Sequence, residues 1–246
     1  GNGTSLKRWE KFKEKLDFTY VVHLTTSAKH ATELAKACAQ SGESQLLIAF
    51  GGDGTAHEVI EGVLDYPNCI VGVVGAGSGN DFGRGFPSFQ QAEQVNMYVQ
   101  SQGETIDMDI GYVVTSPQSF TFVNNAGIGF DAYVAYQVNK SPVKKILNKF
   151  NLGKLAYTFF VMKTLVTFKR FTLTVESPNQ SQTFEKVWFA TISNQPYFGG
   201  GMKISPKSNP ADGEIEMTLV HHLSRIKLLL VFTSVFFGKH TSFKEV

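Results

Sequence analysis

The sequence Gly-Gly-Asp-Gly-Thr at residues 51–55 constrains this chain more than any other feature. The apolar residues 46–50 come before it and predict a buried strand of a parallel sheet. The residues that follow, 56–64, place their apolar side chains on one face of a helix. Thr55 and Glu58 have the spacing of a capping box, which predicts that Thr55 caps this helix. The segment is therefore expected to form a strand, a glycine turn and a helix.

A turn of this kind favours the binding of anionic oxygens. Glycines let the backbone adopt positive φ and let a bulky ligand approach closely. The free N–H groups of the turn and of the helix start then face the anion. A carboxylate does not suit a site for phosphate alone, so Asp53 is expected to meet a metal ion on the phosphates or the proton of an attacking hydroxyl. The alternative is a tight turn in which Asp53 is only a solvated turn residue.

Composition and charge limit the classes of function. The chain has 246 residues with 42% hydrophobic and 18% charged content, as expected for one large or two ordinary globular domains. A net charge of +2 gives no general attraction for nucleic acid, so no nucleic-acid partner is expected. Residues 132–175 hold eight Lys or Arg and no Asp or Glu, which leaves −6 on the rest of the chain. This basic segment predicts an anionic partner, and peripheral membrane contact is expected from Lys140 to Arg170.

The cysteines and the longest apolar run also restrict the interpretation. Cys38 lies in a helical pattern and Cys69 begins an apolar strand, so both are predicted to be small core residues rather than a disulfide. This usage fits a reducing, cytoplasmic compartment. The run from Leu228 to Phe237 is far shorter than the ~20 residues that span a bilayer, so no membrane crossing is predicted.

Strands and helices alternate along the first part of the chain, which predicts a parallel sheet with helices on both faces. A second glycine-rich loop, residues 75–84, follows a predicted strand just as the first does. Ligands of such sheets bind at the carboxyl ends of the strands, so the two glycine loops are expected to converge. The other predicted elements are helices over 4–16, 28–40 and 89–100 and strands over 19–24 and 69–74.

The pattern changes near Gly103, which predicts an α/β domain over residues 1–103 and a β-rich domain, a sandwich, over 104–246. The predicted strands are 105–115, 120–124, 171–176, 186–193 and 215–220, with helical patterns within 143–168 and after Ser224. The segment Gly127 to Ala132 also fits G-x-G-x-x-A after a strand. Dinucleotide binding is not favoured there, because no convincing acidic residue follows at the required distance.

Several motifs together resemble the diacylglycerol kinase catalytic domain family, which includes sphingosine and ceramide kinases and soluble bacterial lipid kinases. The first two are the glycine loops, residues 51–55 and 77–82. The third, residues 122–132, is similar to the family's F-x-N-x-x-G-x-G-F-D-A. Residues 199–213 are similar to its G-G-G-M…P…D-G, and residues 238–240 to a late G-K-H. The resemblance covers nearly the whole chain in the right order.

The resemblance implies an α/β nucleotide-binding domain, a β-sandwich domain that contributes to the lipid site, and transfer of the γ-phosphoryl group of ATP to a lipid hydroxyl with Mg2+. It implies that Gly1-Asn2-Gly3 ends a nucleotide-proximal loop. It implies a catalytic acidic network of Asp53, Asp81 and Asp109. It implies a structural Mg2+ at Asp212 with carbonyls of Asn209 and Glu214. It implies an ATP site lined by Thr25, Gly51, Gly52, Asp53, Gly54, Thr55, Ala56, His57 and Ser78.

This sequence departs from the family's P-x-G-T-x-N-D-F-A-R at three positions. Pro is replaced by Gly75, Thr by Ser78 and Ala by Gly83. Ser78 keeps the hydroxyl, so a phosphate contact remains available. Gly75 loosens the loop through the entropy of the unfolded chain, by roughly 0.4–1 kcal/mol relative to Pro.

Simpler interpretations remain open for several of these residues. Asp81 is equally expected to cap the helix that follows it. Asp109 is also compatible with an ordinary strand-end residue, and Asp212-Gly213 with a hairpin turn. His57 fits a helix-face residue better than a catalyst. For the whole chain, a catalytically silent nucleotide- or lipid-binding regulator and, with less support, a NAD kinase are the alternatives.

The functional protein is expected to extend past both ends of this sequence. A parallel sheet would normally place a strand before Gly1-Asn2-Gly3. The resemblance implies further strands after residue 246, with a D-G-E motif whose Glu is the general base. If this base is absent, Asp109 is the first residue in this chain to consider. The lipid that is phosphorylated is not identified by the sequence, and a dimer is left open.

Overall fold

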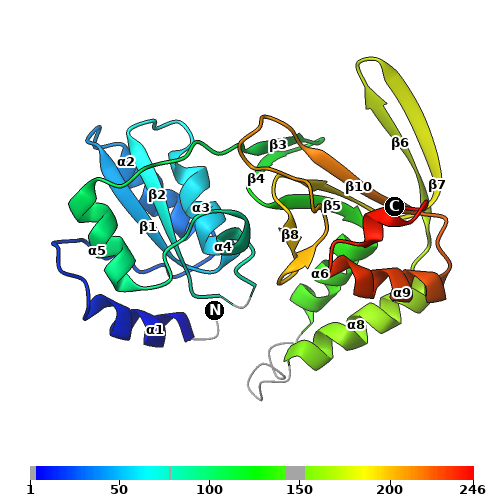
Figure 1. Ribbon diagram of the computed structural model, residues 1–246, viewed down its shortest axis with the longest axis horizontal. Helices are drawn as coiled ribbons and strands as arrows, with labels where there is room; N and C mark the ends of the chain where they lie inside the picture. Colours follow the sequence, from blue (N-terminus) through cyan, green and yellow to red (C-terminus); the bar gives the residue numbers. More distant parts are fainter. Residues whose placement is uncertain (1–3, 78, 142–152) are drawn as a thin grey trace. The chain divides into compact units, whose positions relative to one another are not determined.

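A computed structural model describes residues 4–77, 79–141 and 153–246, which form two structural units (Figure 1). The first unit contains the amino-terminal half of the chain and two later segments, and the second contains the rest. We describe each unit separately. Residues 1–124, 197–201 and 209–214 belong to the first unit, and residues 125–196, 202–208 and 215–246 to the second.

The first unit is built on two parallel strands, β1 (Gln45–Gly51) and β2 (Cys69–Gly75). Their register pairs Gly51 with Gly75, so both strands end at the same level. This arrangement confirms the predicted strand, turn and helix order. The helices of this unit are α1 (Thr4–Lys13), α2 (His30–Ala39), α3 (Asp53–Val63), α4 (Phe82–Gly85) and α5 (Ala92–Ser101).

Helices cover both faces of this sheet. Successive side chains of a strand point to opposite faces, so neighbouring residues of β1 pack against different helices. Leu47 packs with Ala35 of α2 and Val63 of α3. The neighbouring residue Ile48 packs on the other face, in the cluster that α1 and α5 build around Val74. The predicted α/β layer arrangement is therefore confirmed. Cys69 packs with the first of these clusters, and both cysteines are free and half-buried.

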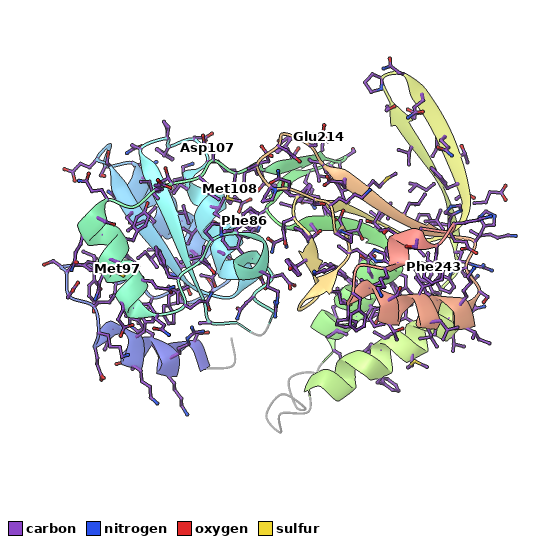
Figure 2. All side chains as sticks on the ribbon, in the orientation of Figure 1. Phe86, Met97, Asp107, Met108, Glu214 and Phe243 are labelled. Atoms are coloured by element: carbon purple, nitrogen blue, oxygen red, sulfur yellow. The ribbon has the colours of Figure 1, made fainter. Side chains whose placement is uncertain are left out.

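The boundary between the units falls at Asn124/Asn125 rather than near Gly103. Residues 104–124 remain with the first unit because Val123 is buried there, with Met108 and Ile110 packed against the same cluster. Met108 packs in one cluster with buried Phe86, and Figure 2 shows the two side chains next to each other. The same stretch also forms a hairpin of β3 (Gly111–Val114) and β4 (Ser119–Phe122), and the short strand β8 (Tyr197–Phe198) belongs to this unit too.

Two local predictions in the first unit are wrong. Residues 19–24 form no strand, and Val21 is 80% exposed. Valine and tyrosine favour a strand only where a neighbouring strand pairs with it, and no described strand does so here. Thr55 does not cap α3, because the helix begins two residues earlier with Gly52 at the cap position. The Thr55 side chain instead lies against Gly51.

The second unit is built on an antiparallel sheet in the order β10–β7–β5, with β6 paired to β7. Its strands are β5 (Asn125–Gly129), β6 (Phe171–Ser177), β7 (Gln180–Ser193) and β10 (Glu216–His221), and β9 (Met202–Lys203) is a short further strand. Three of these strands match predicted ones, whereas β5 and β9 were not predicted. The helices are α6 (Phe130–Lys140), α8 (Gly153–Thr167), α9 (Arg225–Val235) and a 3-10 turn over His240–Ser242.

The core of the second unit lies between the sheet and its helices. Trp188 of β7 is fully buried and packs with Phe130 of α6, Leu165 of α8 and Leu228 of α9. Its indole N–H donates to the carbonyl of Leu223 at 2.8 Å. Residues 142–152 of the basic segment lie outside the described residues.

Candidate active site

The two glycine turns of the first unit touch through their backbones. The N–H of Ala76 donates to the carbonyl of Gly51 at 2.6 Å, which continues the pairing of β1 and β2 into the turns. A Cβ added to Gly77 would lie 2.5 Å from the Cα of Gly52, closer than real Cβ contacts. Glycine is therefore required at this contact, and the predicted convergence of the two loops is observed.

The start of α3 offers backbone donors for an anion. The N–H groups of Thr55 and Ala56 both bond to the carbonyl of Gly52 and close the first helical turn. The N–H groups of Asp53 and Gly54 come before that turn, and among the described residues they have no hydrogen-bond acceptor. Donors of this kind at a helix start, together with the positive end of the helix dipole, suit phosphate oxygens.

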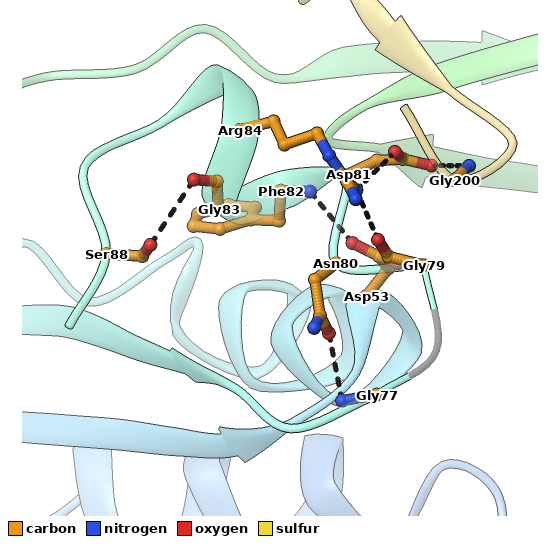
Figure 3. Close-up of polar contacts among 10 residues, drawn as sticks. All are labelled: Asp53, Gly77, Gly79, Asn80, Asp81, Phe82, Gly83, Arg84, Ser88 and Gly200. Atoms are coloured by element: carbon orange, nitrogen blue, oxygen red, sulfur yellow. Dashed lines mark hydrogen bonds and ion pairs between the residues drawn. The ribbon is translucent and has the colours of Figure 1, made fainter. Parts of the chain in front are cut away.

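Asp53 connects the first turn to the helix that follows the second turn. One carboxylate oxygen of Asp53, Oδ1, accepts the N–H of Phe82 at 2.8 Å (Figure 3). Phe82 is the first residue of α4, so Asp53 caps this helix from a distance in the sequence. The hydrogen bond fixes the direction of the carboxylate beside the backbone donors of α3.

Asp81 is held on two sides. It is 6% exposed, and its Oδ1 lies 3.0 Å from Arg84 Nη1. Its Oδ2 accepts the N–H of Gly200 at 2.7 Å (Figure 3). Asp81 occupies the cap position of α4 but makes no capping hydrogen bond with its side chain. The expected capping role is therefore wrong, because Asp53 supplies that bond.

The carboxylates of Asp53 and Asp81 both lie close to Gly79. A Cβ added to Gly79 would lie 2.8 Å from Asp53 Oδ2 and 3.8 Å from Asp81 Oδ2. A side chain at this position would collide with the first carboxylate. The structure thus brings two of the three predicted acidic residues together at the ends of β1 and β2.

Three residues at this site were missed by the sequence analysis. Asn80 has a positive φ of 53°, and its Oδ1 accepts the N–H of Gly77 at 2.9 Å. Arg84 donates to the carbonyl of Gly79 as well as to Asp81. The three-residue spacing of Asp81 and Arg84 on a helix start was a usable signal for their ion pair. The contact with Gly200 carried no signal of that kind.

Asp109 lies in a different set of contacts. Its Oδ2 accepts the N–H of Gly213 at 2.8 Å, and its own N–H donates to the carbonyl of Pro210 at 2.8 Å. These bonds hold the segment 209–214 against it. No hydrogen bond among the described residues joins Asp109 to Asp53 or Asp81. Its catalytic role therefore stays a prediction.

The predicted metal ligands lie in this same segment. Asp212 Oδ1 accepts the N–H of Glu214 at 3.0 Å, and Asn209 Oδ1 accepts the N–H of Ala211 at 3.3 Å. The other carboxylate oxygen of Asp212 accepts no hydrogen bond from a described residue. A carboxylate oxygen and nearby carbonyls suit a hard cation such as Mg2+. Within the described residues, however, no group of three or more His, Cys, Asp or Glu side chains could hold a metal ion.

The remaining predicted ATP-site residues are less closely placed. His57 donates from Nε2 to the carbonyl of Thr121 at 3.1 Å, as expected of a helix-face residue. Thr25 lies in the exposed segment between α1 and α2, and no described hydrogen bond of its own reaches the glycine turns. Ser78 and residues 1–3 lie outside the described residues.

Comparison with known proteins shows the family of this chain. Residues 1–113 match the family model described as the diacylglycerol kinase catalytic domain. Residues 124–246 match the YegS C-terminal NAD kinase beta sandwich-like domain. The chain is 32% identical over 254 residues to YtlR of Bacillus subtilis (strain 168), named as a candidate lipid kinase, and covers 82% of its length. The chain belongs to the diacylglycerol kinase family.

Other family members support the same assignment. A Bacillus subtilis (strain 168) protein named diacylglycerol kinase is 30% identical over 241 residues, with 96% of this chain and 74% of that protein covered. A solved structure from Bacillus anthracis str. Sterne, titled as a candidate diacylglycerol kinase, superposes with a TM-score of 0.61. It is 20% identical and covers 87% of this chain and 68% of the other, so it shows the fold alone. The family consists of lipid kinases with an α/β domain followed by a β-sandwich-like domain.

The described residues contain no membrane-spanning helix, since each helix is too short or too polar for that.

Proposed function

We propose that this protein is an ATP-dependent lipid kinase that transfers the γ-phosphoryl group to a lipid hydroxyl, with diacylglycerol as the first acceptor to test. The observation that supports this proposal most is the pair of touching glycine turns, with the carboxylates of Asp53 and Asp81 both close to Gly79. Phosphoryl transfer depends chiefly on positioning and on stabilising charge. Backbone donors beside an oriented carboxylate provide both.

Each residue of this site has a defined part in the proposed reaction. The backbone N–H groups of Asp53 and Gly54 bind phosphate oxygens. Asp53 is held by the N–H of Phe82 and presents its other oxygen to the acceptor hydroxyl or to a cation. Asp81 positions the glycine segment 199–201 through the N–H of Gly200. Mg2+ bound with ATP would supply positive charge to offset the transferring phosphoryl group.

Labelled ATP and a panel of acceptors test the proposal. Diacylglycerol, phosphatidylglycerol, undecaprenol and a sphingoid base each offer a hydroxyl on an apolar tail, and NAD+ represents the alternative kinase class. The purified chain should label one or more lipids and leave NAD+ unlabelled. Nucleotide binding without any labelled product would instead indicate a silent regulator. A total lipid extract in the same assay would find an acceptor outside the panel.

Contact with a membrane surface is part of the proposal, because the acceptor is a lipid. In the second unit, α8 and α9 expose Phe159, Val166, Ile226 and Leu230 beside Lys163. The two helices are neighbours, since Arg225 of α9 donates to the carbonyls of Leu165 and Val166 of α8. Apolar side chains beside basic ones suit an anionic lipid surface.

Vesicle sedimentation tests this contact. The protein should sediment with vesicles that contain phosphatidylglycerol but not with pure phosphatidylcholine, and 0.5 M salt should weaken the binding because screening shortens the reach of the lysines to about 4 Å. Equal sedimentation with both vesicles would contradict the charge argument.

A structural Mg2+ at Asp212 is the remaining element of the proposal. The carboxylate of Asp212 and the Asp109 contact at Gly213 place hard oxygen ligands in one short segment. Mg2+ should therefore raise the melting temperature of the wild type, and the Asp212→Ala variant should lose this response. Glu176→Ala, in the second unit, is the control. An unchanged Mg2+ response in the Asp212 variant would refute the site.

A further inference from the structure

A basic surface pocket lies in the second unit, lined by residues of β7, of the start of α9 and of the segments that precede β6 and α9. Its volume is about 370 Å³, within the range of roughly 300–1,000 Å³ in which small-molecule ligands are bound. We refer to it as the basic pocket. None of its residues belongs to the glycine turns. The lining residues are Arg170, Lys186, His222, Ser224, Arg225 and Ile226.

Backbone contacts hold both arginines of the basic pocket in place. Arg170 donates from Nη1 to the carbonyl of Leu223 at 3.2 Å, and its guanidinium lies 5.7 Å from the centre of the Trp188 ring. Arg225 donates from Nε to the carbonyl of Leu165 at 2.9 Å. Their remaining N–H groups are thereby fixed before any ligand arrives. Fixed donors bind an anion without the entropy loss of ordering a free side chain.

Lys186 and His222 supply two more nitrogen groups from adjoining backbone positions. The N–H of His222 donates to the carbonyl of Lys186 at 3.1 Å. Both residues have positive φ, 52° and 55°, a conformation uncommon outside glycine. Such backbone strain is often retained at functional sites. Within the described residues the ammonium of Lys186 has no hydrogen bond or ion pair, so it is available to a ligand.

The residues that line the basic pocket include no carboxylate to balance its positive charge. Two guanidiniums and an ammonium gather there with an imidazole, and no Asp or Glu is among the lining residues. The nearby carboxylate of Glu245 is already paired with Lys227. Like charges brought together repel, and a bound anion would relieve that cost. Ser224 is the N-cap of the 11-residue helix α9 at the same place, so the helix dipole adds to the positive field.

We propose that the basic pocket binds a phosphate group, carried by a soluble molecule or by a lipid headgroup. Phosphate suits the pocket because guanidinium N–H groups pair with its oxygens two at a time. Ile226 at the rim is 75% exposed, so an acyl chain or a glycerol moiety could extend over it. The site is separate from the proposed catalytic turns, and its test measures binding alone.

Calorimetric titration with inorganic phosphate, at constant ionic strength in chloride buffer, tests the soluble form. The wild type should bind phosphate, and the part of the binding that the pocket variants remove belongs to the basic pocket. Lys186→Gln and His222→Gln, each made separately, should weaken that binding about tenfold, because each removes a side-chain nitrogen group of a residue that lines the pocket. Lys207→Gln is the matched control, since Lys207 is an exposed lysine of the same unit that does not line the pocket. Melting temperatures establish that all three variants are folded.

Vesicle sedimentation tests the lipid form. Phosphatidylcholine vesicles with and without phosphatidic acid are compared for the wild type, the two pocket variants and the control. Phosphate binding that both pocket variants weaken supports a soluble ligand. Sedimentation with phosphatidic acid that the same variants weaken, in the absence of phosphate binding, supports a lipid headgroup. The proposal is overturned if neither probe binds, or if the pocket variants bind as tightly as the Lys207→Gln control.

Discussion

Two turns of this protein have the same local order of strand, glycine and helix, but the aspartates at their helix starts have different polar partners. In each, a strand passes through glycine into a helix with an aspartate at its start, Asp81 before α4 and Asp131 in α6. Asp81 is paired with Arg84 and with the N–H of Gly200. The hydroxyl of Thr191 is the side-chain donor to Asp131, at 3.4 Å from Oδ2, and Asp131 Oδ1 is buried without a hydrogen bond.

This difference has a direct electrostatic consequence in the second unit. Burial raises the pKa of the Asp131 carboxyl from 3.8 to about 6, against the smaller opposing effects of nearby backbone N–H groups and Thr191. The same residue type after the same kind of turn is therefore used in two ways. In the first unit, Asp81 joins segments that are distant in the sequence. In the second unit, Asp131 has a pKa of about 6. The environment rather than the local motif decides which.

The largest effect is expected for Asp53→Asn, which changes the glycine turn of the first unit. Asparagine can still accept the N–H of Phe82, so the fold should remain. Lipid kinase turnover should fall by roughly 10²–10⁴, because the carboxylate no longer reaches the acceptor hydroxyl or the cation. Labelled-product formation and the melting temperature measure the two effects, with exposed Asp65→Asn as the control. A folded variant with near wild-type turnover would remove Asp53 from the reaction.

The second largest effect is expected for Asp81→Ala, which removes the contacts with Arg84 and Gly200 that distinguish Asp81 from Asp131. The N–H of Gly200 loses its acceptor, and the guanidinium of Arg84 loses its carboxylate partner while it keeps the carbonyl of Gly79. The free energy of unfolding should fall by about 3 kcal/mol, at the low end for a broken buried pair because Arg84 is partly exposed. Urea denaturation measures it, and Asp65→Ala should change little. A loss below about 0.5 kcal/mol would show that Asp81 does not hold the segment 199–201 in solution.

A smaller effect is expected for Asp131→Asn and depends on pH. The folded pKa of Asp131 is above its unfolded value, so the folded state binds the extra proton between pH 4 and 6. The wild type should therefore lose stability as the pH rises through this window, by about 1–2 kcal/mol, since the side chain is only partly shielded from water. The variant should lack this component. Wild-type and variant unfolding curves of parallel slope from pH 4 to 7 would contradict the assignment.

The smallest effect is expected for Thr191→Val, which removes the hydroxyl that donates to Asp131. The contact is long, and its loss should cost about 0.5 kcal/mol. The pKa of Asp131 should rise further, because the charged carboxylate loses a donor. Titration followed by carboxyl NMR measures the shift, with Thr174→Val on the exposed part of β6 as the control. A lower pKa of Asp131 in the Thr191→Val variant would contradict a stabilising hydrogen bond from Thr191 to the charged carboxylate.

The sequence predicts the first unit well where local signals agree. Around residues 45–75 the strand, turn and helix patterns each point to the same fold, and the structure confirms them. Residues 19–24 were predicted as a strand from side-chain preference alone, which does not supply a partner strand. β5 was missed for the opposite reason: Gly127 and Gly129 weaken its strand signal, and its pairing with β7 decides its structure.

The candidate site was only partly predictable, because some of its contacts join residues that are far apart in the sequence. The meeting of Asp53 and Asp81 follows from two strands that end side by side, which the strand order implies. The bond from Gly200 to Asp81 joins residues 119 positions apart, and no local pattern encodes it. Residues 197–201 and 209–214 pack with the first unit although the second unit surrounds them in the sequence. Local secondary-structure propensity does not indicate that these two later segments pack with the first unit.

The close approach of Gly52 and Gly77 has a consequence for amide hydrogen exchange. Because the two turns touch backbone to backbone, neither can open outward while the other keeps its native position. The N–H of Ala76, bonded to Gly51, is then released only by an opening that includes both strand ends. Amides of residues 51–54 and 75–77 should exchange with a common opening free energy, and a nucleotide that protects one turn should slow exchange in the other by the same factor.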